Sequence, residues 1–216
     1  MNDKFKPPPF NYCDYRCDRC DEQENCRVFK DDQERLLDHY RKGEDPYDPE
    51  IFMNDLREIF SRTEKMIKKA AQEHGIDLDG VGEEEIPEVD PEEYVIYRLA
   101  YKYFEETNAF IKTLEKSGIP ENIRPYYDDL VWYHTLIAAK SGRLVSGFID
   151  DLLDDEVSDI EEEGTVSIIR KGIRLSRNAL ESMLSEFPDQ LHAIADLMEI
   201  LNQIEKQMES DIRQKV

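Results

Sequence analysis

The segment "EEYVIYRLAYKYFEETNAFIKTLEKSG", residues 92–118, decides the fold class of this chain. Between residues 94 and 104 apolar side chains lie nearly all round a helix of 3.6 residues per turn, which is typical of a buried helix. Pro91 followed by two glutamates is a favourable helix start, because acidic side chains stabilise the N-terminal end of the helix dipole. Gly118 and Pro120 predict its end. We expect this segment to be the central, most buried helix.

Two helices are predicted on the N-terminal side of this segment. Residues 27–46, "RVFKDDQERLLDHYRKGEDP", read as a short helix that stops near Gly43 and Pro46. A longer helix follows "DPYDPE" (residues 45–50) and ends at Gly75. Its apolar residues recur every three or four positions, which predicts one buried stripe. The stripe consists of Phe52, Leu56, Ile59, Phe60, Thr63, Met66, Ile67, Ala70 and His74.

Three helices are predicted on the C-terminal side, over about 122–152, 165–185 and 188–212. The first has an inner stripe of Tyr127, Leu130, His134, Ile137, Ser141, Leu144 and Phe148. Small residues around Gly142 predict either a close helix neighbour or a kink. The last has a stripe of Leu191, Ala195, Met198, Leu201, Ile204, Glu205 and Met208. Since no strand-like alternation is sustained, we expect an all-α chain, an antiparallel bundle of four to five long helices.

The charge of the chain bears on its partners. The 216 residues carry a net charge of -22, so nucleic acids and anionic membrane surfaces are disfavoured as partners. Two predicted acidic loops, residues 77–93 and 150–163, each hold nine acids and no base. No apolar run approaches the roughly 18 residues of a membrane span. The first residues, "MNDKFKPPPF", lack the apolar core of a secretion signal. We expect a cytoplasmic protein, and its oligomeric state stays open.

All four cysteines fall within fourteen positions of the segment "NYCDYRCDRCDEQENCRV", residues 11–28. They are Cys13, Cys17, Cys20 and Cys26, with the spacing C-x3-C-x2-C-x5-C. In a reducing compartment disulfides are disfavoured, and clustered cysteines indicate a metal site. Residues 1–30 have six acids and six bases and are therefore neutral. We predict a four-cysteine metal-binding module over residues 1–30 and an acidic helical bundle domain over residues 31–216.

Three interpretations of these cysteines are possible: a zinc site, an iron–sulfur cluster and a redox-active dithiol pair. Four thiolates satisfy Zn²⁺ and leave no open position, so such a zinc site would be structural and would fix the N-terminal segment onto the bundle. Short spacings within one loop also suit a 4Fe–4S cluster. A dithiol pair of Cys17 and Cys20 lacks the surroundings that such a pair needs. Arg16, Arg19 and Arg27 would offset the negative charge of either metal centre, and zinc is favoured.

Other candidate sites are weaker. Residues 77–88 follow part of a calcium-loop pattern, but Val81 stands where a ligand is required. His134 on the inner stripe could act in an interior pocket, with Tyr127, Glu105 or Glu106, although a hydrogen-bonded structural histidine is the simpler interpretation. No catalytic motif is present, so enzymatic activity stays uncertain. The expected function is a binding module for a protein partner, and the alternative is electron transfer or redox sensing by an iron–sulfur cluster.

Overall fold

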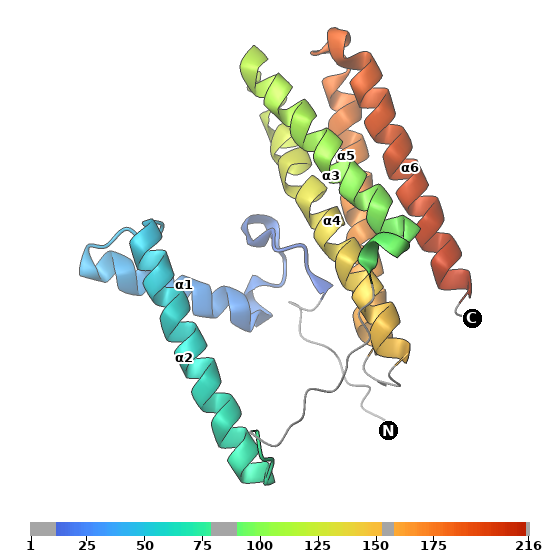
Figure 1. The fold of residues 1–216 in the computed structure, drawn as a ribbon. Helices are drawn as coiled ribbons and strands as arrows, with labels where there is room; N and C mark the ends of the chain where they lie inside the picture. Colours follow the sequence, from blue (N-terminus) through green and yellow to red (C-terminus); the bar gives the residue numbers. More distant parts are fainter. Residues whose placement is uncertain (1–11, 79–89, 153–157, 215–216) are drawn as a thin grey trace. The chain divides into compact units, whose positions relative to one another are not determined.

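The computed structural model describes residues 12–78, 90–152 and 158–214, and over these ranges its regular elements are all helical (Figure 1). The prediction of an all-α chain is confirmed. The α-helices are α1 (Arg27–Lys42), α2 (Pro49–His74), α3 (Val95–Ser117), α4 (Arg124–Leu152), α5 (Ser158–Met183) and α6 (Leu191–Gln214). Over the same residues, none of the helices combines the length and the apolar character needed to cross a bilayer.

Several helix ends follow directly from the sequence. Gly43 and Gly75 stand at the C-terminal ends of α1 and α2 with φ of 76° and 68°. This left-handed conformation costs glycine little, because it has no Cβ. Asp48 begins α2, and its carboxylate accepts hydrogen bonds from the backbone N–H groups of Glu50 (2.8 Å) and Ile51 (3.3 Å). The predicted ends at Gly43, Gly75 and Gly118 are confirmed.

The chain divides into two compact units. The first consists of Met1–Arg16 together with Val89–Val216, and the second of Cys17–Glu88. The first unit contains α3, α4, α5 and α6, which we call the four-helix unit, and the second contains α1 and α2. The division by function into residues 1–30 and 31–216 stays a prediction.

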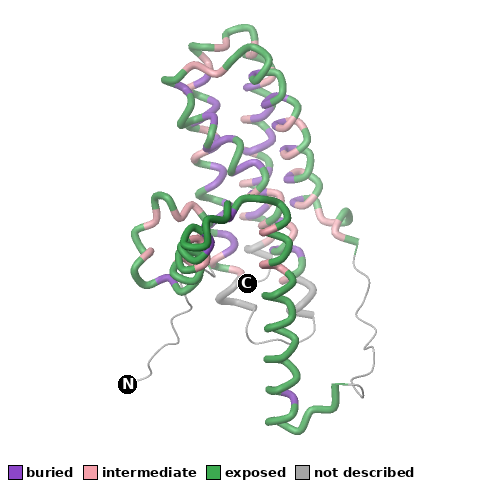
Figure 2. Tube along the Cα trace, turned by 90° about the vertical axis from the view of Figure 1, so that its left-hand side faces the viewer, coloured by how far each residue is buried: buried purple, intermediate pink, exposed green. Residues whose placement is uncertain are grey.

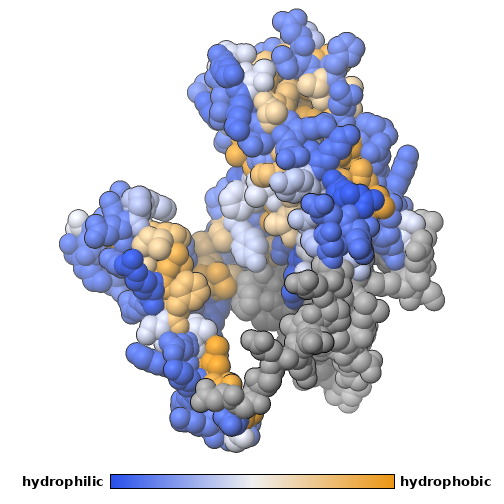
Figure 3. Space-filling model, viewed as in Figure 1, coloured by the Kyte–Doolittle hydropathy of each residue, from blue (hydrophilic) through white to orange (hydrophobic). Residues whose placement is uncertain are grey.

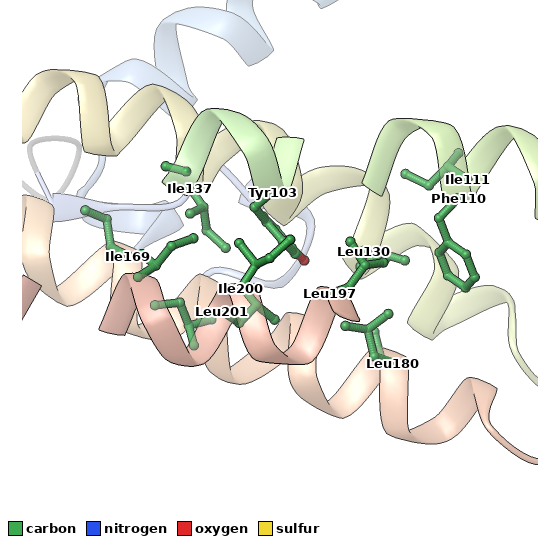
Figure 4. Close-up of a cluster of buried hydrophobic side chains, with 14 of the residues drawn as sticks. Tyr103, Phe110, Ile111, Leu130, Ile137, Ile169, Leu180, Leu197, Ile200 and Leu201 are labelled. Carbon is green, nitrogen blue, oxygen red and sulfur yellow. The ribbon is translucent and has the colours of Figure 1, made fainter. Parts of the chain in front are cut away.

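In the four-helix unit, consecutive helices run in opposite directions (Figure 1). Helix α4 packs against α3 and α5, and α6 packs against α3 and α5. The core between them is apolar (Figure 4), and its fully buried members include Ile96, Leu114, Leu130, Ile137, Ile169, Ile173, Leu180, Ile194 and Leu201. Gly172 of α5 lets α4 approach closely, because a Cβ at this position would lie 2.9 Å from Cγ1 of Ile137.

Two expectations about this unit need correction. Helix α3 is not central: it buries one face, whereas Val95 and Tyr101 are 41% and 48% exposed. Tyrosine tolerates this placement because its ring packs while its hydroxyl meets water. In α6 the predicted stripe is correct from Leu201 onward but wrong in the first turns. Leu191 is 54% exposed, and the core is filled instead by Ile194, Leu197 and Ile200.

The stripe predicted for the helix at residues 52–74 is the largest correction. Helix α2 forms as predicted, but it is exposed along nearly its whole length (Figure 2). Phe60, Met66 and Ile67 are 68%, 65% and 54% exposed, and Ala71 is the buried residue of the helix. Within the described part of its own unit, the prediction that the stripe is buried is therefore wrong. Within its unit, α2 meets α1 through polar pairs near its N-terminal end, at Asp55.

The two acidic segments differ from the expected loops. In the block 150–163, α4 continues to Leu152 and α5 already begins at Ser158, so the prediction of a loop across the whole block is wrong. The helix predicted to start at about 165 is α5, and it starts earlier, at Ser158. In the block 77–93, residues 79–89 lie outside the described residues. Most of the calcium-like pattern at 77–88 lies there too.

Candidate metal centre and its anchor

The four cysteines sit in a series of short turns. Cys13 precedes Asp14, Cys17 begins a one-turn 3₁₀ helix (η2, Cys17–Arg19), and Cys26 directly precedes α1. Cys26 is buried and the other three are half-buried, and none of the four is joined in a disulfide bond. Across the described residues, no three or more His, Cys, Asp or Glu side chains are gathered closely enough to hold a metal ion. The four-thiolate site therefore stays a prediction.

Hydrogen bonds hold the turns that carry Cys17, Cys20 and Cys26. The backbone N–H of Cys20 donates to the carbonyl of Cys17 (3.4 Å), and the N–H of Cys26 donates to the carbonyl of Gln23 (3.3 Å). The side-chain amide of Gln23 also donates to the Cys17 carbonyl. The N–H of Glu22 donates to Sγ of Cys20 (3.4 Å). A backbone donor to a sulfur is the kind of outer contact that supports a metal-bound thiolate.

Asp14 anchors the N-terminal segment to the four-helix unit. It is 7% exposed. Its Oδ2 accepts a hydrogen bond from the Tyr133 hydroxyl and lies 2.7 Å from Nζ of Lys171. Trp132 Nε1 donates to the Asp14 carbonyl (2.8 Å). Burial alone would raise the pKa of Asp14, but the hydrogen bonds from Lys171 and Tyr133 and the charge of Lys171 outweigh it, and the pKa is lowered.

The two residues after Asp14 strengthen this anchor. Arg16 pairs with Asp129 of α4 at 3.3 Å, and its guanidinium carbon lies 5.6 Å from the ring centre of Trp132. Nζ of Lys140 lies 5.4 Å from the ring centre of Tyr15, and Tyr15 has a φ of 57°. A left-handed backbone conformation is unusual for tyrosine. Here the Tyr15 ring contacts Lys140, and the neighbouring residues Asp14 and Arg16 form ion pairs with Lys171 and Asp129. The segment that adjoins Cys13 is thus fixed on α4 and α5.

The three arginines expected to offset thiolate charge all have carboxylate partners. Arg16 pairs with Asp129, Arg19 with Asp18 (3.8 Å), and Arg27 with Asp31 (3.4 Å). The Arg19 and Arg27 pairs are exposed to solvent and contribute little to stability. The Arg16 pair is largely buried, so this arginine has a structural role in the anchor.

His134 lies on the inner face of α4, as predicted, and is 6% exposed. Its Nδ1–H donates to the carbonyl of Leu130 (3.1 Å), Nε2 lies 3.4 Å from the Thr135 hydroxyl, and the ring stacks on Phe104 with centres 5.4 Å apart. Burial lowers the pKa of His134, which favours the neutral imidazole. Tyr127, its expected companion, donates to Glu115 (2.7 Å). These contacts are those of a structural histidine.

A small polar cluster lies inside the four-helix core. The hydroxyls of Tyr103, Thr107 and Ser176 lie close together, and together with that of Ser141 they find no hydrogen-bond partner of acceptable geometry among the described protein atoms. Burial raises the pKa of Tyr103 to about 12. The cluster consists of hydroxyl groups, and burial keeps the Tyr103 hydroxyl protonated.

No pattern in the sequence singles out the residues of the anchor. Asp14 is one of six acids in a neutral segment, and Trp132 and Lys171 belong to no motif. The Asp14–Tyr133 hydrogen bond joins positions 119 residues apart, and no local spacing encodes such a pair. The single tryptophan of the chain was the one available signal, since a partly buried indole usually finds an acceptor for its N–H.

A comparison of this chain with family models, with curated proteins and with solved structures gives no match.

Proposed function

We propose that this chain is an antiparallel helical bundle that carries a structural zinc ion on an N-terminal cysteine module and serves as a protein-interaction module in the cytoplasm. The zinc ligands would be Cys13, Cys17, Cys20 and Cys26. One observation carries the proposal: fourteen positions hold all four cysteines of a 216-residue chain. Four thiolates complete the tetrahedral shell of Zn²⁺ and leave no position for a substrate, so the ion would act in structure.

Two contacts support the zinc proposal. Cys13 adjoins Asp14, which is held by Tyr133 and Lys171, so one ligand would start from a fixed backbone. Sγ of Cys20 accepts a hydrogen bond from the Glu22 N–H, as a metal-bound thiolate does. Both contacts reduce the ordering that metal binding would require.

The charge of the chain supports a protein partner. A net charge of -22 repels phosphate backbones and anionic lipids, whereas it steers association with a basic protein surface. The hydrogen bond of His134 to the Leu130 carbonyl lies within its own helix and suits a structural histidine. These features favour a binding role, with the zinc site holding the N-terminal segment.

The first test is the metal content of the full chain. The protein is purified without oxygen, its zinc, iron and sulfide are measured, and its visible spectrum is recorded. We expect a colourless protein with one zinc ion per chain. If the protein instead contains iron and sulfide and absorbs near about 400 nm, the four cysteines bind a 4Fe–4S cluster and not zinc. That result would favour a redox role. A protein that binds neither zinc nor iron would reject the metal module.

The second test removes one proposed ligand. Cys20→Ser should lower zinc affinity by more than the about 10–100-fold lost with an outer partner, because a direct thiolate bond disappears. Asp21→Asn is the matched control: the residue is exposed, adjoins Cys20 and retains all four cysteines. Equal zinc affinity in the two variants, measured by competition with a chelator, would show that Cys20 is not a ligand.

A further inference from the structure

The face of α2 that the sequence marks as apolar is not covered by α1, the other helix of its unit. Its large side chains Phe52, Met53, Ile59, Phe60, Met66 and Ile67 are 46–68% exposed. Figure 3 shows apolar side chains gathered along this helix, which we call the α2 face. At about 200 Å² for each large side chain, the α2 face exposes about 600 Å², so pairing two copies would remove about 1,200 Å² from water, the lower end of the range for stable interfaces.

The spacing on the α2 face is that of a coiled-coil seam. Phe52, Leu56, Ile59, Thr63, Met66 and Ala70 follow one another at intervals of four, three, four, three and four residues. Each successive pair of intervals spans seven residues, the heptad repeat that keeps an apolar seam against a second helix. Phe60 and Ile67 widen the seam on one side. The partner that fits the α2 face is therefore a straight helix of similar length.

The charges on α2 select the orientation of that partner helix. The helix carries five acids and five bases, although the whole chain has a net charge of -22. Residues 49–61 have three acids and one base, and residues 62–74 have four bases and two acids, so the halves carry -2 and +2. An antiparallel second copy of α2 places each acidic half against a basic half. A parallel copy would place like charges together.

We infer that this protein forms a homodimer through an antiparallel pair of α2 helices. In the register that aligns the seams, Phe52 faces Ala70 of the second copy, Leu56 faces Met66, and Ile59 faces Thr63. Phe52 meets a small side chain at each end of the seam, and the two Phe60 side chains meet near the two-fold axis. The inference is independent of the zinc proposal, because α2 contains none of the cysteines.

The test measures the mass of the full-length protein by sedimentation equilibrium at micromolar concentration. We expect about 51 kDa, twice the 25.5 kDa of the chain. Phe60→Glu should weaken the dimer by about 100-fold or more, because it removes a central aromatic contact and brings two negative charges together. Ser61→Glu adds the same charge at the next position, which is exposed and lies outside the seam, and should leave the dimer intact.

A mixing experiment separates the proposed face from a folding defect. Phe60→Glu and Phe60→Lys proteins should each be largely monomeric alone and should form a heterodimer when mixed, since opposite charges then meet at the axis. A photo-crosslinking residue in place of Phe52 should attach near Ala70 of the second copy. A monomeric wild-type protein, a dimer that survives Phe60→Glu, or a crosslink from position 52 to position 52 or to the four-helix unit would each overturn the inference.

Discussion

The buried carboxylate of Asp14 shows how a single residue fixes the segment beside Cys13. It accepts a hydrogen bond from the Tyr133 hydroxyl and lies 2.7 Å from the Lys171 ammonium. The indole N–H of Trp132 donates a hydrogen bond to the backbone carbonyl of Asp14. A buried carboxylate needs such partners, because an unpaired charge would carry the full cost of lost hydration. The residues that surround Cys13 are therefore positioned by long-range polar contacts, whether or not a metal is bound.

Asp14→Asn should release the N-terminal segment. Losing the charged contacts to Lys171 and Tyr133 should cost about 1.5–3 kcal/mol of docking free energy, which is about ten-fold or more in the population of the undocked segment. Tryptic cleavage after Arg16, whose side chain is 16% exposed, should accelerate by that factor. Asp18→Asn is the control, since Asp18 is 61% exposed. Equal cleavage rates in the two variants would show that Asp14 is not the anchor.

At the scale of helices, glycine decides how closely α4 and α5 pack. Gly172 sits where a Cβ would lie 2.9 Å from Ile137 and 3.4 Å from Tyr133, whereas a Cβ at Gly147 would meet nothing within 4 Å. Both glycines lie within helices, Gly147 in α4 and Gly172 in α5. Replacing each by alanine therefore distinguishes the effect of close packing from the effect of helix propensity.

Gly172→Ala should lower the free energy of unfolding by about 1 kcal/mol, since crowding of about 1–3 kcal/mol outweighs the gain of about 0.5–1 kcal/mol from replacing a helical glycine. Gly147→Ala, with the same gain and no crowding, should be neutral or stabilising. Urea unfolding of both variants measures the difference. If both variants gain stability alike, the close approach of α4 and α5 is wrong.

The pair of helices α1 and α2 should respond to pH through His39. Hydrogen bonding to Glu44 (2.8 Å) and to Asp55 (3.1 Å), together with their negative charges, outweighs the opposing effect of burial and raises the pKa of His39. A raised pKa means that the charged form stabilises the fold. This contribution is fully present below about 6.5, the ordinary value, and is lost as pH rises through the folded pKa above it.

Hydrogen exchange of α1 and α2 should therefore accelerate as the pH rises from 6 through the folded pKa of His39, beyond the ordinary chemical increase of exchange with pH. His39→Gln should remove this additional change, because glutamine does not titrate. An NMR titration of the histidine ring should show a midpoint above 6.5. A midpoint below 6.5 would contradict the ion pairs with Glu44 and Asp55.

The sequence predicted helices better than it predicted their surroundings. Gly43, Gly75 and Gly118 ended helices as expected, because a helix end is a local property of the backbone. The stripe of α4 was also correct from Tyr127 to Leu144. In α6 several apolar stripes compete, and the choice between Leu191 and Ile194 depends on where α3 and α5 lie. No local pattern contains that information.

At the scale of the whole molecule, the core is independent of the cysteine segment. Among the described residues, the apolar core of the four-helix unit lies between Tyr94 and Met208, and the cysteines end at position 26. A domain with its own core does not require a metal to fold. The core of the four-helix unit therefore contains none of the proposed zinc ligands and no residue of the α2 face.

Chelation should consequently loosen only the N-terminal part of the chain. After treatment with a strong zinc chelator, far-UV circular dichroism should retain nearly all of its helical signal, while proteolysis within residues 1–30 should become faster. Because Asp14 holds the segment before Cys17, the additional cleavage should concentrate after Cys17. A collapse of helicity on chelation would contradict an independent core.

In the proposed centre, one zinc ion is bound by the four thiolates of Cys13, Cys17, Cys20 and Cys26. The most direct measurement is X-ray absorption at the zinc edge on the purified full-length protein. We expect four sulfur neighbours at about 2.3 Å from zinc, and no nitrogen or oxygen ligand. A shell with nitrogen or oxygen ligands, or iron in place of zinc, would contradict the proposed centre.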